Sequence, residues 1–145
     1  MKKIITYLLF TVLSICAFGQ TRCDSGHLNI DLSFKRCVIN NNILTIDFVV
    51  TNLDKDDIRI SITHGSKAYD DEGNCYIKGF SFDLGNTGSS ECSFPSDTPL
   101  KLRCYINDID EYATNIVRLD INYIINNNYS QRGTMIVKNI PFSRE

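Results

Sequence analysis

Residues 44–51, with the sequence LTIDFVVT, decide the fold class of this chain. Apolar side chains occupy every second position from Leu44 to Val50, and Thr45 and Asp47 stand between them. This period of two is typical of a β-strand with one buried face, whereas an amphipathic α-helix repeats about every 3.6 residues. No stretch after residue 20 sustains the helical period.

The same alternation recurs along the chain, with turn-forming residues between the alternating stretches. The further predicted strands are residues 28–34, 58–63, 76–84, 100–106, 117–125 and 134–140. About seven short strands predict an all-β fold, an antiparallel immunoglobulin-like β-sandwich, with a β-barrel as the main alternative. The chain has no Trp, so "immunoglobulin-like" describes its architecture and not the Cys…Trp…Cys signature of true immunoglobulin domains.

The first 19 residues have the pattern of a signal peptide. Lys2 and Lys3 precede an apolar run over residues 4–17, and Ala17 and Gly19 place small residues before a predicted cut at Gln20. The run is shorter than the roughly 20 residues that span a bilayer. We therefore expect a signal peptide over residues 1–19, a single β-sandwich domain over 20–145, no transmembrane helix in the mature chain, and a secreted, periplasmic or cell-surface location.

One competing interpretation concerns Cys16. Residues 13–16, LSIC, loosely match a bacterial lipoprotein box, in which Cys16 would be lipidated and would anchor the chain. Ile15 is a poor residue just before such a cut, where small residues are usual. We therefore favour cleavage before Gln20.

Composition excludes some classes of function. Of the 145 residues, 43% are hydrophobic and 22% are charged, which is enough to build a core. The net charge of -2 leaves no basic footprint, so we expect no nucleic-acid partner. The two His residues, His27 and His64, are scant material for general-base catalysis or a His-based metal site.

Five cysteines follow the predicted cut: Cys23, Cys37, Cys75, Cys92 and Cys104. An exported compartment favours disulfides, and no C-x-x-C spacing suggests a redox or zinc site. Cys75 and Cys92 flank one loop-rich stretch and are the predicted pair. Cys104 falls on an inward strand position and is interpreted as a small buried hydrophobe rather than a reactive thiol. The odd number leaves at least one thiol free or paired between chains.

Several motifs together resemble a known group of domains. They are NILTIDF (42–48), VTN (50–52), AYDDEGNCY (68–76), PSDTP (95–99) and NIPF (139–142). This combination is similar to secreted or surface immunoglobulin-like domains of Bacteroidetes-type bacteria that are often labelled as of unknown function. The resemblance covers nearly all of the mature chain. It implies an extracellular sandwich without assigned catalytic residues, in which Cys75 and Cys92 are additions.

One acidic turn is a candidate metal site. Asp70, Asp71, Glu72 and Asn74 place four oxygen-bearing side chains within five residues, and calcium takes oxygen ligands. One turn cannot complete a calcium coordination shell. Asn107, Asp108, Asp110 and Glu111 would add ligands if the two loops met at one end of the sandwich. The simpler interpretation is ordinary turn chemistry, because Asp, Gly and Asn are favoured in tight turns.

His64 invites a hydrolase interpretation, because Gly65 and Ser66 follow it and several Asp residues lie nearby. A catalytic triad is recognised by geometry, and no nucleophile elbow accompanies these residues. We therefore interpret His64 and His27 as residues at strand ends and expect no catalytic residues.

Tyrosines are the better candidates for binding. Tyr69, Tyr76, Tyr105, Tyr112 and Tyr129 fall at turns or on outward strand positions, where Tyr stacks on ligands and forms interface hot spots. Ordinary cross-strand packing is the alternative.

Val49, Ile116 and Ile124 fall on outward positions of the predicted alternation. Such side chains are covered where loops or a second chain lie over a sheet. They are weak evidence for self-association, because single exposed apolar side chains are normal on protein surfaces.

The sequence thus favours a non-catalytic exported β-sandwich with a binding or structural role in the cell envelope, where a protein or glycan would be its partner. One alternative is a calcium-binding adhesion-type module. A second is a small secreted hydrolase, or an inhibitor of one.

Overall fold

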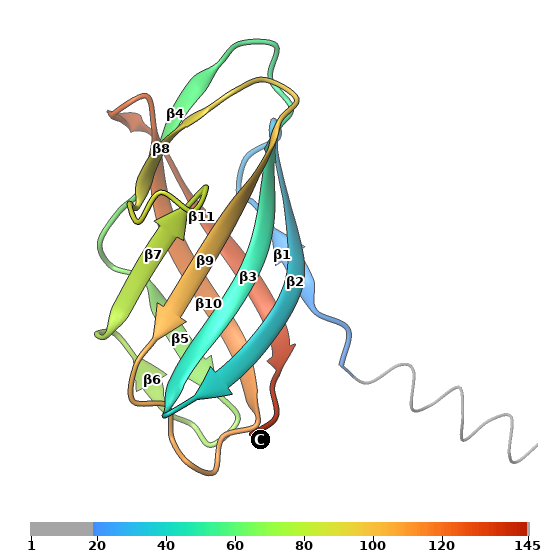
Figure 1. Ribbon diagram of the computed structural model, residues 1–145, viewed down its shortest axis with the longest axis vertical. Coiled ribbons are helices and arrows are strands. Elements are labelled where there is room, and N and C mark those ends of the chain that lie inside the picture. Colours follow the sequence, from blue (N-terminus) through green and yellow to red (C-terminus); the bar gives the residue numbers. More distant parts are fainter. Residues whose placement is uncertain (1–18, 145) are drawn as a thin grey trace, which may run out of the picture.

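The computed structural model describes residues 19–144, and these form two antiparallel β-sheets packed face to face (Figure 1). In the seven-stranded sheet the strand order is β1-β11-β10-β4-β8, and β5 pairs with both β10 and β6. In the four-stranded sheet the order is β2-β3-β9-β7. The predicted immunoglobulin-like β-sandwich is confirmed, and the barrel alternative is wrong because the strands divide into two sheets.

The strands differ widely in length. The seven-stranded sheet consists of β1 (Arg22–Asp24), β4 (Ile58–Ile62), β5 (Lys67–Asp70), β6 (Cys75–Tyr76), β8 (Glu91–Phe94), β10 (Asn115–Ile125) and β11 (Asn128–Pro141). The four-stranded sheet consists of β2 (Ile30–Asn40), β3 (Ile43–Asn52), β7 (Phe80–Leu84) and β9 (Pro99–Ile106). The long hairpins β2–β3 and β10–β11 form the two broad walls of the sandwich.

The core lies between these two walls. From β3, the four apolar residues of the deciding alternation are fully buried: Leu44, Ile46, Phe48 and Val50. From β10, Leu119, Ile121 and Tyr123 are buried against them. Each such large side chain contributes roughly 1.5–3 kcal/mol by leaving water, so this alternation supplies much of the driving force for folding.

Residues 19–144 contain eleven strands rather than the predicted seven. The additional strands β1, β5 and β8 have three or four residues each, which is too few to display an alternation. The predicted strand over residues 76–84 is divided into β6 and β7, which lie in different sheets. The chain crosses from one sheet to the other at Gly79, which has a φ of 77°.

This crossing also explains why the predicted Cys75–Cys92 disulfide is not formed. All five cysteines between residues 19 and 144 are free thiols. Cys75 lies in β6 at one end of the seven-stranded sheet, and Cys92 lies in β8 near the other end (Figure 1). The loop-rich stretch between them passes through β7 in the opposite sheet instead of returning as a hairpin. Cys104 is fully buried as predicted, and burial raises the pKa of its thiol.

One irregularity in β10 reverses predicted orientations. The β10–β5 pairing shifts register between Ile116 and Arg118, so Ile116 is fully buried and Val117 is exposed, opposite to the prediction. A β-bulge changes the face on which the following side chains lie, which a strict alternation cannot reproduce. Ile124 keeps its predicted outward side, where it lines a recess on the outer surface, yet it is only 8% exposed.

Leu28 is a further correction, since it was predicted to open a buried strand face. It is almost completely exposed, because β2 begins only at Ile30. The predicted signal peptide and Cys16 lie outside the described residues, apart from Gly19. Between residues 19 and 144 there is no helix long and apolar enough to cross a membrane.

Candidate functional site

One recess on the surface forms where β4 and β5 both pair with β10. β10 pairs with β4 through residues 123–125 and with β5 through residues 116–120. Ile121 and Asn122 therefore have no strand beside them on that edge. Only the link between β4 and β5 passes there, and Thr63 donates its backbone N–H to the carbonyl of Asn122 (2.8 Å).

Gly65 allows this link to lie close to β10. Its φ of 91° is a conformation that side chains disfavour, and a Cβ at this position would lie 3.1 Å from Asn122 Nδ2. The link therefore passes close to Asn122 without forming a strand, and the outer surface is hollow there.

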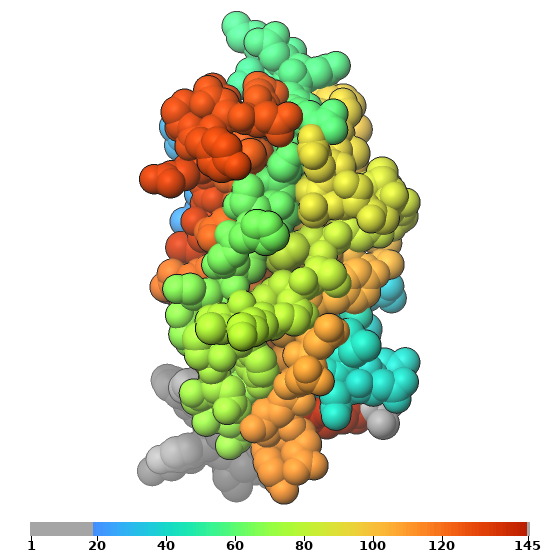
Figure 2. All heavy atoms as spheres, turned by 90° about the vertical axis from the view of Figure 1, so that its left-hand side faces the viewer, coloured from blue at the N-terminus to red at the C-terminus, as the bar shows by residue number. Residues whose placement is uncertain are grey.

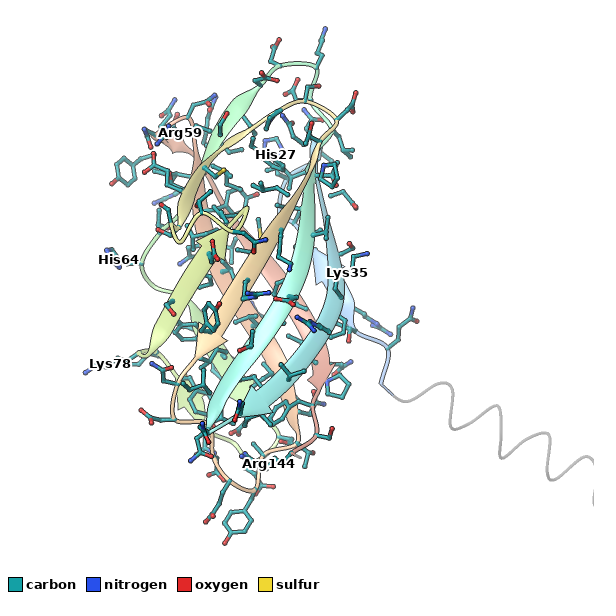
Figure 3. All side chains as sticks on the ribbon, in the orientation of Figure 1. His27, Lys35, Arg59, His64, Lys78 and Arg144 are labelled. Carbon is teal, nitrogen blue, oxygen red and sulfur yellow. The ribbon has the colours of Figure 1, made fainter. Side chains whose placement is uncertain are left out.

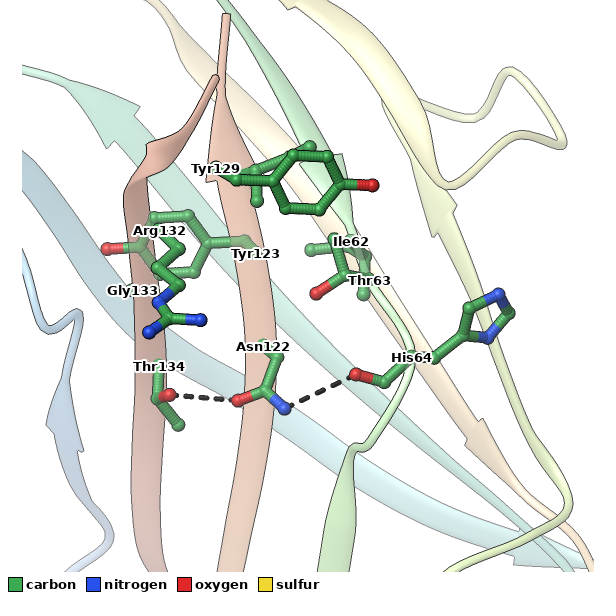
Figure 4. A pocket seen from close by; sticks show the side chains of 10 residues that line it. Ile62, Thr63, His64, Asn122, Tyr123, Tyr129, Arg132, Gly133 and Thr134 are labelled. Carbon is green, nitrogen blue, oxygen red and sulfur yellow. Dashed lines mark hydrogen bonds between the residues drawn. The ribbon is translucent and has the colours of Figure 1, made fainter. Parts of the chain in front are cut away.

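The resulting hollow, which we call the Tyr129 recess, has a volume of about 790 Å³ and lies on the outer side of the seven-stranded sheet (Figure 4). Ten residues line it: Ile62, Thr63, His64, Asn122, Tyr123, Ile124, Tyr129, Arg132, Gly133 and Thr134. In Figure 2 the tip of the β10–β11 hairpin, in red-orange, stands beside β4 and its following link, in green. The recess is thus built from the β10–β11 hairpin and from residues 62–64, which lie about 60 residues earlier in the sequence.

Asn122 is held in place at the floor of the recess. Thr134 Oγ1 donates to Asn122 Oδ1 (2.8 Å), and Asn122 Nδ2 donates to the carbonyl oxygen of His64 (3.3 Å), as Figure 4 shows. The second of these bonds is long, and the amide nitrogen has a second N–H to offer. The floor therefore presents a fixed amide beside the buried side chain of Ile124.

Tyr129, Arg132 and His64 stand around this floor. Tyr129 is 75% exposed, and Arg132 and His64 are also exposed. In Figure 4 the side chains of Tyr129 and Arg132 lie on the same side as Asn122, whereas the His64 imidazole points away from Asn122 at the border of the recess. No Asp or Glu occurs among the ten lining residues, so Arg132 makes the recess electropositive.

The turn between β10 and β11 sets the position of Tyr129. Asn126 and Asn127 both have positive φ (53° and 54°), the conformation of a tight two-residue hairpin turn. Asn128 Oδ1 then accepts hydrogen bonds from Ser130 N and Ser130 Oγ (3.0 and 2.8 Å). This local bonding fixes the first residues of β11 and holds the exposed ring of Tyr129 at the edge of the recess.

Gly133 makes room for the ring of Tyr123, which lies on the next strand and also lines the recess. A Cβ at Gly133 would lie 2.4 Å from Tyr123 Oη, so the bare backbone lets the Tyr123 ring pass across β11. The Tyr123 hydroxyl then donates to the carbonyl of Ser25 (2.7 Å). Burial raises the pKa of Tyr123 to about 12, so this hydroxyl stays a hydrogen-bond donor at neutral pH.

The predicted calcium turn is arranged differently, since its carboxylates face hydrogen-bond donors of the protein. Asp70 is only 3% exposed. It accepts bonds from the backbone N–H groups of Glu72 (3.0 Å) and Asn74 (2.8 Å), from Asn74 Nδ2 (2.9 Å) and from Tyr76 Oη (2.6 Å). Four donors thus occupy this one carboxylate.

The two acidic loops do meet, as the calcium hypothesis required. Asn74 Nδ2 also donates to Asp110 Oδ2 (3.0 Å), and the backbone N–H of Asp110 donates to Tyr76 Oη (3.0 Å). We call Asp70, Asn74, Tyr76 and Asp110 the Asp70 network. It joins the β5–β6 turn to the loop before β10 through hydrogen bonds between side chains and backbone.

Asp71 makes a second connection between the same loops. It accepts hydrogen bonds from Thr114 N (3.0 Å), Thr114 Oγ1 (2.6 Å) and Asn115 N (3.1 Å). Glu72 is exposed, and its side chain makes no hydrogen bond within the described residues. Between residues 19 and 144, no three His, Cys, Asp or Glu side chains converge as metal ligands. Asp70 and Asp71 therefore accept hydrogen bonds from different parts of the chain, Asn74 donates to Asp70, and the Glu72 side chain takes no part.

The pKa values follow from this bonding. Burial acts to raise the pKa of Asp70, but the hydrogen bonds from Tyr76 and Asn74 outweigh it and hold that pKa below its ordinary value. The pKa of Asp71 is lowered in the same way by Thr114 and Asn115. Burial and the neighbouring Asp70 carboxylate raise the pKa of Tyr76 to about 12. These groups stabilise the folded chain with Asp70 charged and Tyr76 neutral.

The tyrosines predicted to bind a ligand do not form one platform. Tyr112 precedes β10 and Tyr129 follows it, so the two most exposed rings lie at opposite ends of that strand. Tyr69 pairs with Arg118 on the seven-stranded sheet, whereas Tyr105 pairs with Thr45 on the four-stranded sheet. Tyr76 belongs to the Asp70 network. Of the five, Tyr129 lines the recess beside Asn122 and Arg132.

Neither histidine is arranged as a catalytic base. His27 Nδ1 accepts a hydrogen bond from the backbone N–H of Asn29 (3.1 Å), and His64 is exposed at the border of the recess. Within residues 19–144, neither imidazole is hydrogen-bonded to a carboxylate or to a nucleophilic hydroxyl. The sequence singled out His64 and Tyr129 but not Asn122 and Arg132. Asn122 lay at an outward position of the predicted strand 117–125, whereas Arg132 lay outside the predicted strands, because β11 begins earlier than expected.

No protein-family model matches this chain, and no curated protein matches it. Among solved structures it is similar to the ASH/PapD-like domain (PapD-like domain 7) of human CEP192, with a TM-score of 0.44, 8% identity, and coverage of 83% of this chain and 89% of that chain. It is also similar to the CooA pilin subunit from enterotoxigenic Escherichia coli, with a TM-score of 0.37, 11% identity, and coverage of 79% and 95%. No functional conclusion follows from these loose likenesses, and the resemblance to Bacteroidetes-type domains stays a prediction.

Proposed function

We propose that this protein is a non-catalytic module of the cell envelope that binds a glycan in the Tyr129 recess. The observation that carries the proposal is the grouping of one exposed aromatic ring with an amide and a guanidinium around a single hollow, with His64 at its border. Binding sites typically combine a stacking or apolar surface with a few fixed polar groups. The signal-peptide pattern supports an exported location.

Each group has its own part in binding. The face of Tyr129 offers a flat apolar surface for a sugar ring, and its hydroxyl stays in water. Asn122, fixed by Thr134, offers an amide N–H to a sugar hydroxyl. Arg132 presents a planar guanidinium that forms paired hydrogen bonds with carboxylate or sulfate groups. Because no acidic residue lines the recess, we expect acidic glycans to bind more tightly than neutral ones.

The experiment is a glycan microarray, followed by titration calorimetry with the best ligand. Tyr129→Ala should weaken binding by about tenfold or more, the loss expected for an aromatic residue at a binding hot spot. Tyr112→Ala is the matched control, because Tyr112 is 71% exposed and lies at the opposite end of β10. Equal binding by the two variants, or no glycan ligand for the wild-type protein, would refute the proposal.

A further inference from the structure

The edge strand β7 leaves part of its backbone without a partner. β7 ends the four-stranded sheet, and only β9 pairs with it. Asn107 N–H donates to the carbonyl of Gly79 (3.0 Å), and Gly85 N–H donates to the carbonyl of Lys101 (2.7 Å). Alternate residues of a strand direct their backbone groups to the same side, so odd-numbered residues of this segment face β9.

It follows that the backbone groups of Phe80 and Phe82 face away from β9. Within residues 19–144, their N–H and C=O groups have no backbone partner on that side. The next even residue, Leu84, is different because its N–H donates to the carbonyl of Ser89 in the returning loop (2.8 Å). The free edge is therefore confined to Phe80 and Phe82, and the loop closes it at one end.

A groove of about 480 Å³ runs along this free edge. One wall is the β4–β5 link with Thr63, His64 and Ser66, and the other includes Phe80 and Phe82 of β7. Figure 2 shows this side of the molecule, and in Figure 3 His64 and Lys78 project from it. The groove thus lies along the open side of the sandwich, between the edges of the two sheets.

Two further observations show that the chain itself leaves a hydroxyl and several apolar side chains of this groove without partners. Ser66 is only 5% exposed, yet its Oγ has no hydrogen-bond partner among the described residues. Such a buried hydroxyl without a partner is unusual in folded proteins. Ile77, which also lines the groove, is 60% exposed, and the stacked rings of Phe80 and Phe82 are only half-buried.

We propose that an extended segment of a partner polypeptide binds in this groove as an additional strand beside β7. Its backbone would pair with the free N–H and C=O groups of Phe80 and Phe82, which is the mode of recognition called β-augmentation. Its alternate side chains would point between the sheets against Phe80, Phe82 and Ile62. These side chains must therefore be apolar.

Charge complementarity defines the partner segment further. Lys78 lies at the end of the groove where β7 begins, and no acidic side chain lines the groove. An acidic residue at the corresponding end of the segment would pair with Lys78. The partner is thus an extended strand with apolar residues at alternate positions and an acidic flank. This surface adjoins the Tyr129 recess, because His64 lines both, but it uses neither Tyr129 nor Arg132.

The test is selection from a phage-displayed library of random peptides of about ten residues, long enough to form one strand. The proposal requires enrichment of alternating apolar sequences with an acidic flank. Their binding should change the NMR amide signals of Phe80 and Phe82. Failure to enrich any peptide, or signal changes confined to other strands, would overturn it.

A pair of variants at Phe80 isolates the backbone contribution. Phe80→Pro and Phe80→Ala both remove the ring, but only proline removes the free N–H, and proline is tolerated at the first residue of a strand. Phe80→Pro should bind the selected peptide about tenfold more weakly than Phe80→Ala. This is the loss expected when one backbone hydrogen bond to the added strand cannot form. Equal affinities would contradict strand addition, provided that both variants show the same cooperative unfolding as the wild type.

Two further variants separate peptide binding in the groove from effects on stability and from glycan binding in the Tyr129 recess. Ser66→Ala should weaken peptide binding severalfold. It should not lower the melting temperature, because the hydroxyl has no partner to lose in the free protein. Tyr129→Ala should leave peptide binding unchanged even where it abolishes glycan binding. Dimerisation that Phe80→Pro abolishes, detected by sedimentation, would replace the partner peptide by a second copy of the chain and overturn the proposal as stated.

Discussion

The Asp70 network and the Tyr129 recess are both rich in polar side chains, yet they differ in where those side chains find partners. In the Asp70 network, one buried carboxylate accepts four hydrogen bonds from the same chain. In the Tyr129 recess, Asn122 is the residue held by such bonds, and the rings of Tyr129 and His64 are exposed. The first region joins two loops, and the second leaves its groups free for a ligand.

This difference teaches that a cluster of functional groups in the sequence does not by itself indicate a site. Asp70, Asp71, Glu72 and Asn74 are close in sequence and looked like metal ligands. The oxygens of Asp70 and Asp71 already accept hydrogen bonds from the protein, and among the described residues no three such side chains converge. The groups around the Tyr129 recess come from the β10–β11 hairpin and from residues 62–64, and the fold brings them together without satisfying them internally.

The largest expected effect is that of Asp70→Ala. Removing the carboxylate leaves Tyr76 Oη, Asn74 Nδ2 and two backbone N–H groups without their acceptor, so we expect a loss of about 3 kcal/mol in unfolding free energy. Urea denaturation measures it. The matched control is Glu72→Ala in the same turn, which should change stability by no more than about 0.5 kcal/mol. Similar losses in the two variants would show that the Asp70 network contributes little.

The next prediction concerns pH. Because the folded-state pKa of Asp70 lies below its ordinary value, the charged carboxylate stabilises the fold at pH above about 3.9, the ordinary value of Asp. That stabilisation is lost as the pH falls through the lower folded-state pKa. The difference in unfolding free energy between the wild type and Asp70→Asn should therefore be constant near neutral pH and shrink below pH of about 4. A difference that grows toward low pH would contradict the hydrogen-bonded arrangement.

Substitutions in the recess should have a small effect on stability. Arg132→Ala and His64→Ala remove exposed side chains that make no side-chain hydrogen bond within the described residues. Each should change the unfolding free energy by about 0.5 kcal/mol or less while weakening the binding of an acidic glycan. Thermal unfolding and titration calorimetry on the same samples give both quantities. A large loss of stability would show that these residues support the fold, as those of the Asp70 network do.

The smallest expected effect is that of calcium. The carboxylates of Asp70 and Asp71 already accept hydrogen bonds from the protein, so we expect them not to bind calcium. Millimolar calcium should then shift the melting temperature by about 1 °C or less, because only a ligand that binds the folded state stabilises it. Scanning calorimetry with and without a chelator measures the shift. A rise with calcium that the chelator reverses would restore the calcium-binding adhesion hypothesis.

Much of the fold was predictable, because long strands with one buried face repeat their pattern often enough to be seen. The alternation from Leu44 to Val50 and its counterparts in β2, β4, β9 and β11 correspond to strands of the structure. The strands β1, β5 and β8 were missed because their pairing comes from neighbours in space rather than from their own pattern. At Ile116 the alternation failed because a register shift reverses the orientation of the side chains.

The candidate site was predictable only in part. Tyr129 was identified because an exposed aromatic ring at a turn is visible in the sequence. The recess beside it exists because β4 and β5 both pair with β10 and leave Asn122 between them, and no local pattern encodes that arrangement. The predicted Cys75–Cys92 pair failed for a related reason, since the chain between them visits the opposite sheet.

The pairing of β1 with β11 has a consequence for how the molecule acquires its structure. Arg22 and Lys138 are partners across this edge, so the first described strand finds its neighbour only after almost all of the chain is present. β10 likewise pairs with segments on both sides of it in the sequence. Contacts of such long sequence separation make folding slow. A chain emerging with its N-terminus first would therefore expose the apolar face of β2 and β3 until β10 and β11 arrive, and a period of protection from aggregation would be part of its biogenesis.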